Sequence, residues 1–521
     1  MNIRILFSLF FYGIFYLIIT SSNFASTFPF LLFSFIIAFF TFPIGLKNIL
    51  IAAICVFLSS FLTSYYLISI KDGTLAHYKL LSQIQLITNS STIFVSLLFG
   101  LLLSFVTFLG ALSRITKSLI FMILYYCGYV LFFAPILLIA SILARYLGKK
   151  KIDVGLGPEP MINNVYHKKA LQIYGYTAET FVDSVYFITS EFDYRGDLLK
   201  IKTNKFFKDY FYLLGIWLFI RSIFRYKSLY IYFNGSSLKS YPVLSVLEPH
   251  LLRISRTKVV VMPYGGDIHD MMHCPNLLFK NAMAMDYPSY YKMNERVKKQ
   301  IVRWTNHADV VISGCDWVDY TYHWDILTLA HFSIDIVRFD KLKTDNPVYR
   351  NSFSMDKPLR VLHAPNHKTI KGTSFVVKAI EELQNEGRPV ELILLQGRAN
   401  TEIIEEIAKS DLIIDQLVIG WYAMFALESL CMAKPVVCNL RQDLVDLYVG
   451  SGLLSSHEEV PFINGNIFNI KQILINILDG KINLSVYGKK SYAYVSKHHS
   501  IEKIGQIFDD VNKKLNLSPS V

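Results

Sequence analysis

The sequence predicts an α/β protein in which an all-α transmembrane region of about five helices precedes two successive parallel-sheet domains. Two observations predict this architecture. Long apolar runs fill residues 1–151, and each is close to the length of roughly 18 to 25 residues that a membrane-spanning helix needs. From residue 152 onward, short β-rich runs alternate with helical segments, as in parallel sheets covered by helices.

The apolar runs predict the membrane region 1–151. We expect spans at residues 3–20, 28–46, 48–69, 92–112 and 119–146. The first run could instead be a signal peptide that ends near "SNFAS". Because no Asp or Glu lies inside any run, the spans predict an anchor or a lipid-binding groove rather than a pump.

Charge and cysteine content indicate where the chain resides. The net charge is +12, and residues 1–151 contain ten Lys or Arg but one acidic residue, so the excess belongs to the membrane flanks and no nucleic-acid partner is expected. The basic cluster "RYLGKKK" after the last run places residues 152–521 in the cytoplasm, at the inner or plasma membrane. The six cysteines form no CxxC pair, which fits a reducing compartment. Self-association through the membrane region is left open.

Two series of alternating segments predict two Rossmann-like domains, at 152–345 and 346–521, with a polar seam near 341–357. In the first series we expect strands at 151–157, 176–182, 228–235, 258–267, 308–314 and 331–339, and helices at 163–175, 205–226, 242–255 and 294–307. In the second we expect strands at 358–366, 389–397, 411–417 and 434–440, and helices at 373–386, 401–409 and 422–433. The apolar segment 205–227 is either a buried helix or one that dips into the membrane.

Ligands of such sheets bind beyond the carboxyl ends of the strands, and several motifs follow strands here. In "HAPNHKTIKGTS", a strand ending at His363 leads through His367, Lys368, Lys371 and Gly372 into a helix. Free N–H groups, the helix dipole and an ammonium group form an anion site there, unless Lys371 is an ordinary exposed lysine.

Glu428 lies in the middle of an apolar helix, "YAMFALESLCMA". Its carboxylate could face water or pair with Lys434. Alternatively, because its helix starts at the carboxyl end of the sheet, it could accept hydrogen bonds from neighbouring ribose hydroxyls.

Two glycine-containing loops follow strands of the first series. Gly155 and Gly157 in "GLGPEP", and Gly265 and Gly266 in "PYGGD", would let a ligand approach the backbone closely. Asp267, His269, Asp270, His273 and Cys274 could form a metal cluster, but a substrate loop is the preferred interpretation. The chain has no DxD triplet, so we expect no metal and no cofactor besides the donor substrate.

Residues 363–387, 390–400 and 410–437 resemble the nucleotide-sugar-binding half of family 4 (group 1) glycosyltransferases of GT-B fold. "VVVMPYGGDI" and "RWTNHADVVISG" resemble the acceptor half. The resemblance implies a metal-independent, retaining transfer from a nucleotide-diphosphate sugar. It matches Lys371 to the diphosphate lysine and Glu428 to the second glutamate of a pair, which binds ribose.

Three positions depart from that family. Its first glutamate falls at Gly420, with Asp415 and Gln416 just upstream, and its acceptor-side histidine falls at Tyr264. The arginine usual before the lysine is absent. The catalytic candidates are Lys371, Asp267 and Tyr264. The substrate-binding candidates are Glu428, Gly155, Gly157, Gly265, Gly266, His363, His367, Lys368, Gly372, Asp415, Gln416, Gly420 and Tyr422.

The sequence thus predicts a membrane-anchored glycosyltransferase that acts on a lipid-linked or polysaccharide acceptor. One alternative is an inactive GT-B relative that serves as a membrane scaffold in polysaccharide assembly, motivated by Gly420 and Tyr264. A nucleotide-sugar epimerase of the same fold is a third reading, and it would not need five spans.

Overall fold

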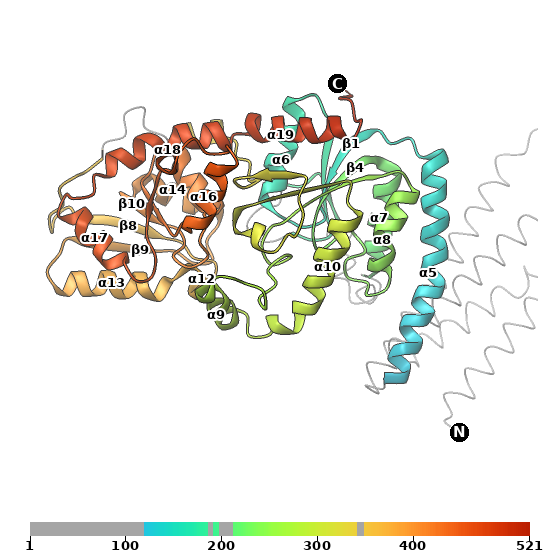
Figure 1. Cartoon of the computed structure of the whole chain (residues 1–521), viewed down its shortest axis with the longest axis horizontal. Helices are drawn as coiled ribbons and strands as arrows, with labels where there is room; N and C mark the ends of the chain where they lie inside the picture. Colours follow the sequence, from blue (N-terminus) through green and yellow to red (C-terminus); the bar gives the residue numbers. More distant parts are fainter. Residues whose placement is uncertain (1–118, 186–190, 197–211, 341–348, 521) are drawn as a thin grey trace, which may run out of the picture. The chain divides into compact units, whose positions relative to one another are not determined.

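The computed structural model describes residues 119–185, 191–196, 212–340 and 349–520. Within these ranges lie two parallel β-sheets with helices packed around them (Figure 1). Both sheets belong to one compact unit, Leu137–Asn204 with Lys208–Val521. The expected α/β architecture with two parallel sheets is therefore confirmed.

The last predicted span is a helix, α5, over Leu119–Leu147. Its segment Tyr126–Leu147, 22 residues long, is the one helix among the described residues that is long and apolar enough to cross a membrane. This finding rests on length and composition only. The other predicted spans, at 3–20, 28–46, 48–69 and 92–112, lie outside the described residues.

The first sheet has seven parallel strands in the order β3-β2-β1-β4-β5-β6-β7. Val154 of β1 lies opposite Ala178 of β2 and Ser228 of β4, so the chain changes direction across the sheet at β1. The strands are β1 Ile152–Leu156, β2 Ala178–Val182, β3 Tyr194–Arg195, β4 Tyr226–Tyr232, β5 Lys258–Met262, β6 Val310–Gly314 and β7 Ile326–Thr328.

The helices of this half are α6 Ile162–Ile173, α7 Tyr212–Arg225, α8 Leu244–Ile254, α9 Leu277–Asp286, α10 Asn294–His307 and the short α11 Val337–Asp340. Two 3-10 helices, η3 Tyr290–Met293 and η4 Cys315–Asp319, complete it. In α7, Leu214, Leu218, Phe219 and Ile223 are buried. The described part of segment 205–227 is therefore a packed helix of this domain.

The second sheet has five parallel strands in the order β12-β11-β10-β8-β9. Its strands are β8 Leu359–His363, β9 Val390–Leu394, β10 Leu412–Ile414, β11 Val436–Cys438 and β12 Phe462–Asn464. Its helices are α12 Lys368–Lys371, α13 Thr373–Asn385, α14 Asn400–Lys409, α15 Met424–Cys431, α16 Gln442–Gly450, α17 Ile470–Leu478 and α18 Leu484–His498. One 3-10 helix, η5 His457–Glu459, lies between α16 and β12. Because β9 and β10 lie on opposite sides of β8, the topological switch point lies between β8 and β10, where parallel sheets bind ligands.

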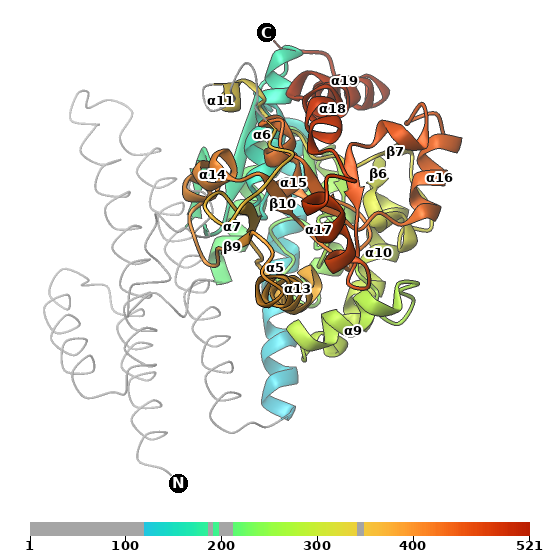
Figure 2. The same cartoon turned by 90° about the vertical axis from the view of Figure 1, so that its left-hand side faces the viewer.

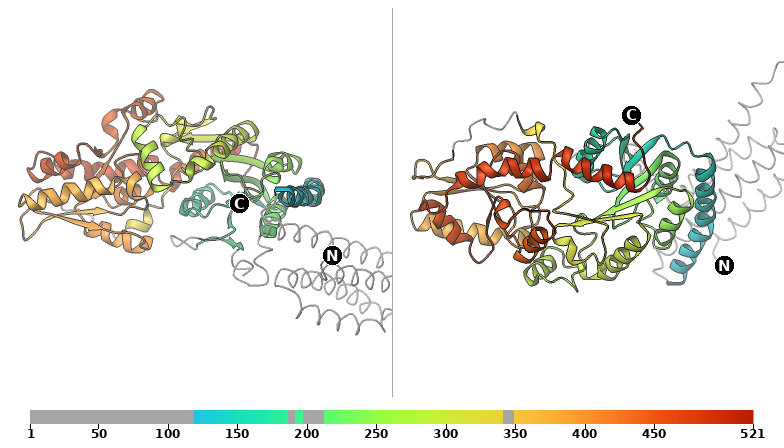
Figure 3. Two further views of the ribbon diagram at one scale, coloured as in Figure 1. Left: turned by 90° about the horizontal axis from the view of Figure 1, so that it is seen from below. Right: turned by 45° about the horizontal axis from the view of Figure 1, so that its top comes forward.

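The last helix, α19 Ile501–Lys514, packs on the first sheet, although the range expected for the second domain included it. Its Ile504, Phe508 and Val511 join the core around Val154. Tyr176 donates a hydrogen bond to Asp509 at 2.9 Å. Figures 2 and 3 show α19 beside α6.

The strand predicted at 331–339 is wrong. Its alternating pattern reflects burial of Phe332, Ile334 and Ile336 without a paired strand. Ile334 makes one isolated bridge to Ser500, and α11 begins at Val337. Apolar residues at alternate positions can thus occur in a segment that is buried on both sides without strand pairing.

Candidate functional site

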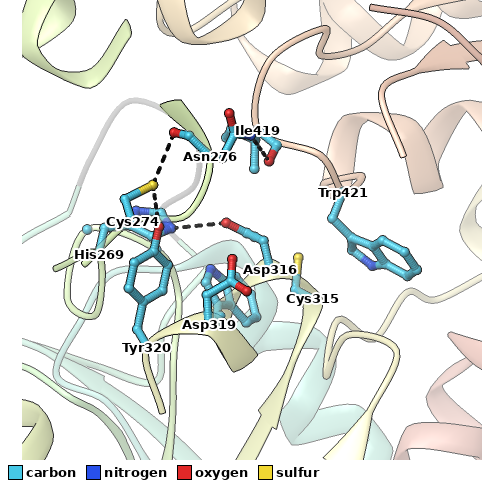
Figure 4. A network of polar contacts seen from close by, with 12 residues as sticks. His269, Cys274, Asn276, Cys315, Asp316, Asp319, Tyr320, Ile419 and Trp421 are labelled. Carbon is cyan, nitrogen blue, oxygen red and sulfur yellow. Dashed lines mark hydrogen bonds and ion pairs between the residues drawn. The ribbon is translucent and has the colours of Figure 1, made fainter. Parts of the chain in front are cut away.

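Loops that follow strands of the two sheets meet and are joined by hydrogen bonds and ion pairs (Figure 4). Asn276, which caps the N-terminus of α9, donates from Nδ2 to the carbonyl oxygens of Val418 and Ile419 at 2.8 and 2.9 Å. Arg441, after β11, pairs with Asp319, which ends η4 after β6. The carboxyl ends of strands from both sheets therefore face one junction.

A second set of contacts joins α9 to the loop after β8. Asp286, the last residue of α9, accepts hydrogen bonds from the backbone N–H groups of Thr369 and Ile370 at 3.0 and 2.9 Å. The next residue, Tyr287, bonds through its hydroxyl to Nδ1 of His367 at 2.7 Å. These two N–H groups thus bind a protein carboxylate, and His367 has a partner in the first half of the chain.

Lys371 lies at the switch point and is mostly buried. Its Nζ lies 2.5 Å from Oδ1 of Asp415, with 12% of the lysine side chain exposed and none of the aspartate. Asp415 follows β10, and its other oxygen accepts from the N–H of Ala423 at 3.2 Å. Lys368, by contrast, is exposed. Lys371 and Asp415 are therefore brought together, whereas Lys368 stands apart from this pair.

The glycine after Lys371 is required by its backbone. Gly372 has φ +75°, and a Cβ there would lie 3.0 Å from Cβ of Leu417. A side chain would be strained and would press on the loop that follows β10. Gly372 thus lets α12 end and α13 begin beside Lys371.

His363, predicted as a substrate contact, has protein partners on both nitrogens of its ring. It is fully buried; its Nδ1 donates to the carbonyl oxygen of Ile414 at 2.9 Å, and its Nε2 lies 3.0 Å from the Thr373 hydroxyl. Burial lowers the pKa of His363 to about 4. The neutral ring therefore ties β8 to β10 and α13, and has no atom left for a ligand.

Glu428 is buried in α15, with 4% of the residue exposed. Its Oε1 accepts a hydrogen bond from Nδ2 of Asn400 at 2.9 Å. Burial raises the pKa of Glu428 to about 7, while Asn400 and Arg338 act to lower it and Asp415 to raise it. Oδ1 of Asn400 is buried without a hydrogen-bond partner among the described residues. Glu428 and Asn400 can therefore accept further hydrogen bonds from a ligand near Asp415.

Two predicted residues, Gln416 and Tyr422, hold the loop between β10 and α15 in shape. Tyr422 is fully buried, and its hydroxyl bonds to the Tyr494 hydroxyl and to His499 at 2.7 and 2.8 Å, so it offers no exposed atom to a substrate. Gln416 donates from its amide to the Trp421 carbonyl oxygen. Both are placed to stabilise the loop.

Gly420 stands where the resemblance places a carboxylate, and the structure explains the glycine. Its φ is +102°, and a Cβ would lie 2.6 Å from Cδ of Arg441. Arg441 pairs with Asp319 and Asp443, and these partners raise its pKa even though burial opposes the increase. The site that would hold the family's first glutamate is therefore filled by the arginine side chain.

On the first sheet, the loop after β5 is built around Asp267. This fully buried carboxylate accepts from the N–H groups of Phe233, Tyr264 and Gly265 at 2.9 to 3.0 Å, and burial raises its pKa to about 6. Asp267 therefore shapes the loop, and does not point a free oxygen at a substrate. The Tyr264 hydroxyl accepts from Asn234 at 2.7 Å. Gly266 borders open space, since a Cβ there would meet nothing within 4 Å.

Gly155 and Gly157, predicted to let a ligand approach the backbone, are closely surrounded by protein atoms. A Cβ on Gly155 would lie 2.5 Å from the Tyr226 ring, and one on Gly157 would lie 2.0 Å from the Phe181 carbonyl oxygen. Both are buried. These glycines make room for protein atoms rather than for a ligand.

The residues considered for a metal cluster separate into different contacts. His273 bonds to Asp270 at 2.6 Å, and Tyr320 donates to Sγ of Cys274 at 3.1 Å. His269 places Nε2 3.4 Å from Oδ2 of Asp316. Among the residues that the structure describes, no group of three or more His, Cys, Asp or Glu is arranged to hold a metal ion.

Several junction residues were not predicted: Asn276, Asp286, Asp316, Asp319, Asn400 and Arg441. Asp316 and Arg441 follow β6 and β11 within three residues, so the rule for strand ends could have found them. Asn276 caps α9 and Asp286 ends it, and this helix was not revealed by the sequence pattern.

No protein-family model matches the chain, and no curated protein matches it. Solved structures with a similar fold include Anabaena HepE in complex with UDP, at 11% identity over 70% of this chain and 100% of that one, with a TM-score of 0.42. Sucrose-phosphate synthase from Thermosynechococcus elongatus is also similar, at 11% identity over 71% of this chain and 97% of that one, with a TM-score of 0.44.

Proposed function

We propose that the chain is a membrane-anchored glycosyltransferase that moves a sugar from a nucleotide-diphosphate sugar to a lipid-linked or polysaccharide acceptor, with retention and without a metal. One observation carries the proposal. At the switch point of the second sheet, the mostly buried Lys371 pairs with Asp415, whose charge acts in turn on the buried carboxylate of Glu428. Beside Glu428, Oδ1 of Asn400 lacks a hydrogen-bond partner among the described residues.

Lys371 and the start of α13 suit a diphosphate. The first N–H groups of a helix have no intrahelical partner and carry the positive end of its dipole. α13 has 13 residues and begins two positions after Lys371. A diphosphate oxygen bound there would compete with Asp415 for the ammonium group. As the bond between the sugar and the diphosphate breaks, Lys371 would stabilise the negative charge that develops on the leaving group.

Glu428 and Asn400 suit the ribose. A carboxylate this deeply buried is unfavourable unless it gains hydrogen bonds. Two neighbouring hydroxyls could donate to Glu428 and to Oδ1 of Asn400, which is buried without a partner in the described chain. A ligand with such hydroxyls would thus supply the bonds that this site lacks.

The acceptor would approach from the first sheet. Gly266 borders open space in the loop after β5, next to the junction of the two sheets. In this proposal Asp267 and Tyr264 position that loop, and residues 152–521 lie in the cytoplasm, where nucleotide sugars are made. The apolar helix α5 supports an anchor by its length.

A second candidate is an inactive relative that acts as a membrane scaffold. It is favoured by Arg441, which fills the place of the family's first carboxylate, and by the ion pair that occupies Lys371. Calorimetric titration of the full chain in nanodiscs with several nucleotide-diphosphate sugars, followed by a donor-hydrolysis assay, separates the two. An enzyme binds and slowly hydrolyses one donor, whereas a scaffold that binds no donor would overturn the proposal.

A further inference from the structure

α9 carries an exposed face without a charged residue. Its exposed positions lie on one side of the helix, because steps of 100° per residue place positions 1, 2, 5, 8 and 9 within one arc. These residues, which we call the α9 face, are Leu277, Leu278, Asn281, Ala284 and Met285. Phe279, Ala282 and Met283 are buried on the opposite side. A surface helix normally turns charged residues outward, and α9 does not.

The exposure on this face is large. Leu277 is 75% exposed and Met285 is 67% exposed. In the following segment, Tyr291 is 71% exposed and Met293 is 44% exposed. Single exposed apolar residues need no explanation, but a cluster of them in one helix and the turn after it indicates a docking surface.

The chain next to the α9 face is strongly basic. Residues 287–303 contain five Lys or Arg and one Glu. Lys292, Lys298 and Lys299 are exposed, and η3 packs against both α9 and α10. Lys292 also places Nζ 5.7 Å from the ring centroid of Tyr291. Apolar and aromatic side chains bordered by lysines are complementary to the interface of a bilayer with anionic headgroups.

We propose that the α9 face docks on the anionic surface of the bilayer that anchors the chain. The lysines would contact the headgroups, while Leu277, Leu278 and Met285 would reach the acyl boundary. This inference rests on the membrane anchoring proposed above, and is independent of the sugar transfer.

Docking at α9 would reach the candidate site, because α9 is held to the second half of the chain at both ends. Asn276 holds the carbonyl groups of Val418 and Ile419, and Asp286 holds the N–H groups of Thr369 and Ile370, next to Lys371. Figure 1 shows α9 beside α12. The membrane surface would therefore support the helix that sets the position of both loops.

The test is lipid photocrosslinking of the full chain. Proteoliposomes are made from phosphatidylcholine with a minor fraction of anionic phosphatidylglycerol, whose negative surface attracts lysine-rich segments. The phosphatidylglycerol carries a diazirine in its acyl chain. Crosslinked peptides are mapped by mass spectrometry.

We expect adducts in residues 277–293 and in α5. The double variant Leu277→Ser/Met285→Ser should lower the 277–293 adducts about tenfold and leave the α5 adducts unchanged. The matched control, Met355→Ser/Phe468→Ser, replaces two residues that are 71% and 79% exposed elsewhere, and should change neither set.

Each other result overturns the proposal. Adducts in α5 without any in 277–293 would show that the chain is anchored but that the α9 face does not dock. Crosslinks from 277–293 to a second copy of the chain would assign the face to a protein partner. Equal adducts in purely phosphatidylcholine vesicles with a labelled neutral lipid would remove the requirement for anionic headgroups. Absence of adducts in both α5 and 277–293 would remove the anchor as well, whatever the outcome of donor titration.

Discussion

Replacement of Glu428 by glutamine is expected to stabilise the protein and weaken donor binding at the same time. The folded-state pKa of Glu428 is about 7, above its ordinary value of 4.5, chiefly because of burial. Between these pH values the folded state binds more protons than the unfolded state, so stability falls as the pH rises through this window. At about 1.4 kcal/mol per pH unit, the full difference corresponds to about 3 kcal/mol.

Glutamine removes this ionisation and keeps one oxygen for the hydrogen bond from Asn400. The variant should therefore melt at a higher temperature than the natural chain at pH 8, by an increment equivalent to at most about 3 kcal/mol. The two proteins should converge near pH 5, where Glu428 is protonated in the folded state. Thermal denaturation of the full chain in nanodiscs, measured from pH 5 to pH 8, gives this comparison.

Donor binding should change in the opposite direction. A hydrogen bond to a charged group contributes about 1.5–3 kcal/mol, so loss of the carboxylate should weaken donor affinity roughly ten- to a hundredfold at pH 8. The affinity of the natural chain should rise as the pH increases through about 7, and that of Glu428→Gln should not. Isothermal titration calorimetry with the donor measures both.

Glu248 supplies the matched control. It is also fully buried with a pKa raised to about 7 by burial, but its carboxylate accepts from the backbone N–H groups of Ser236 and Leu238 in the first half of the chain. Glu248→Gln should leave donor affinity unchanged. If Glu428→Gln melts earlier at pH 8 and binds donor normally, Glu428 is a packing residue and the reasoning is refuted.

Further outcomes follow from the same geometry. Lys371→Ala should lower kcat more than it raises KM in a transfer assay, because the lysine faces charge that develops on the leaving group. Lys368→Ala, a variant of the exposed neighbour, should change neither constant. If Lys371→Ala were as active as the natural chain, the diphosphate would lie elsewhere. Gly420→Glu should lower the melting temperature rather than restore a family-like site, because φ is +102° and Arg441 occupies the space. Gly387→Ala should lower the melting temperature less, because φ is +72° there but no atom lies within 4 Å of a new Cβ. Transfer activity should survive EDTA, and loss that Mg²⁺ or Mn²⁺ reverses would reopen the metal question. A C-terminal reporter that works only outside the cytoplasm should be silent, and a strong signal would contradict the proposed topology.

Most of the second sheet could be predicted because its strands are short apolar runs bounded by clear helix signals. The predicted helix 373–386 is α13, Thr373–Asn385, and 401–409 is α14, Asn400–Lys409. Helix α9 was missed because its exposed side is apolar, so no helical periodicity marks it. The strand predicted at 331–339 failed for the converse reason: apolar residues alternate there, but residues 331–334 are all buried and the segment forms one isolated bridge.

For the site, sequence position alone could place residues near strand ends but could not tell which atoms were free. His363 and Tyr422 lie where ligands bind, yet their polar atoms bond to Ile414, Thr373, Tyr494 and His499. The Lys371–Asp415 pair depends on two loops meeting across the sheet, which spacing in the sequence does not reveal. The glycine at position 420 could be explained only from the structure, because the side chain of Arg441 fills the space that a side chain there would need.

The most direct test of the central claim is calorimetric titration of the full chain in nanodiscs with a panel of nucleotide-diphosphate sugars, repeated on Lys371→Ala and Glu428→Gln. We predict saturable binding of at least one donor by the natural chain, and weaker binding of the same donor by both variants. Binding of no donor, or binding that neither substitution changes, would contradict it.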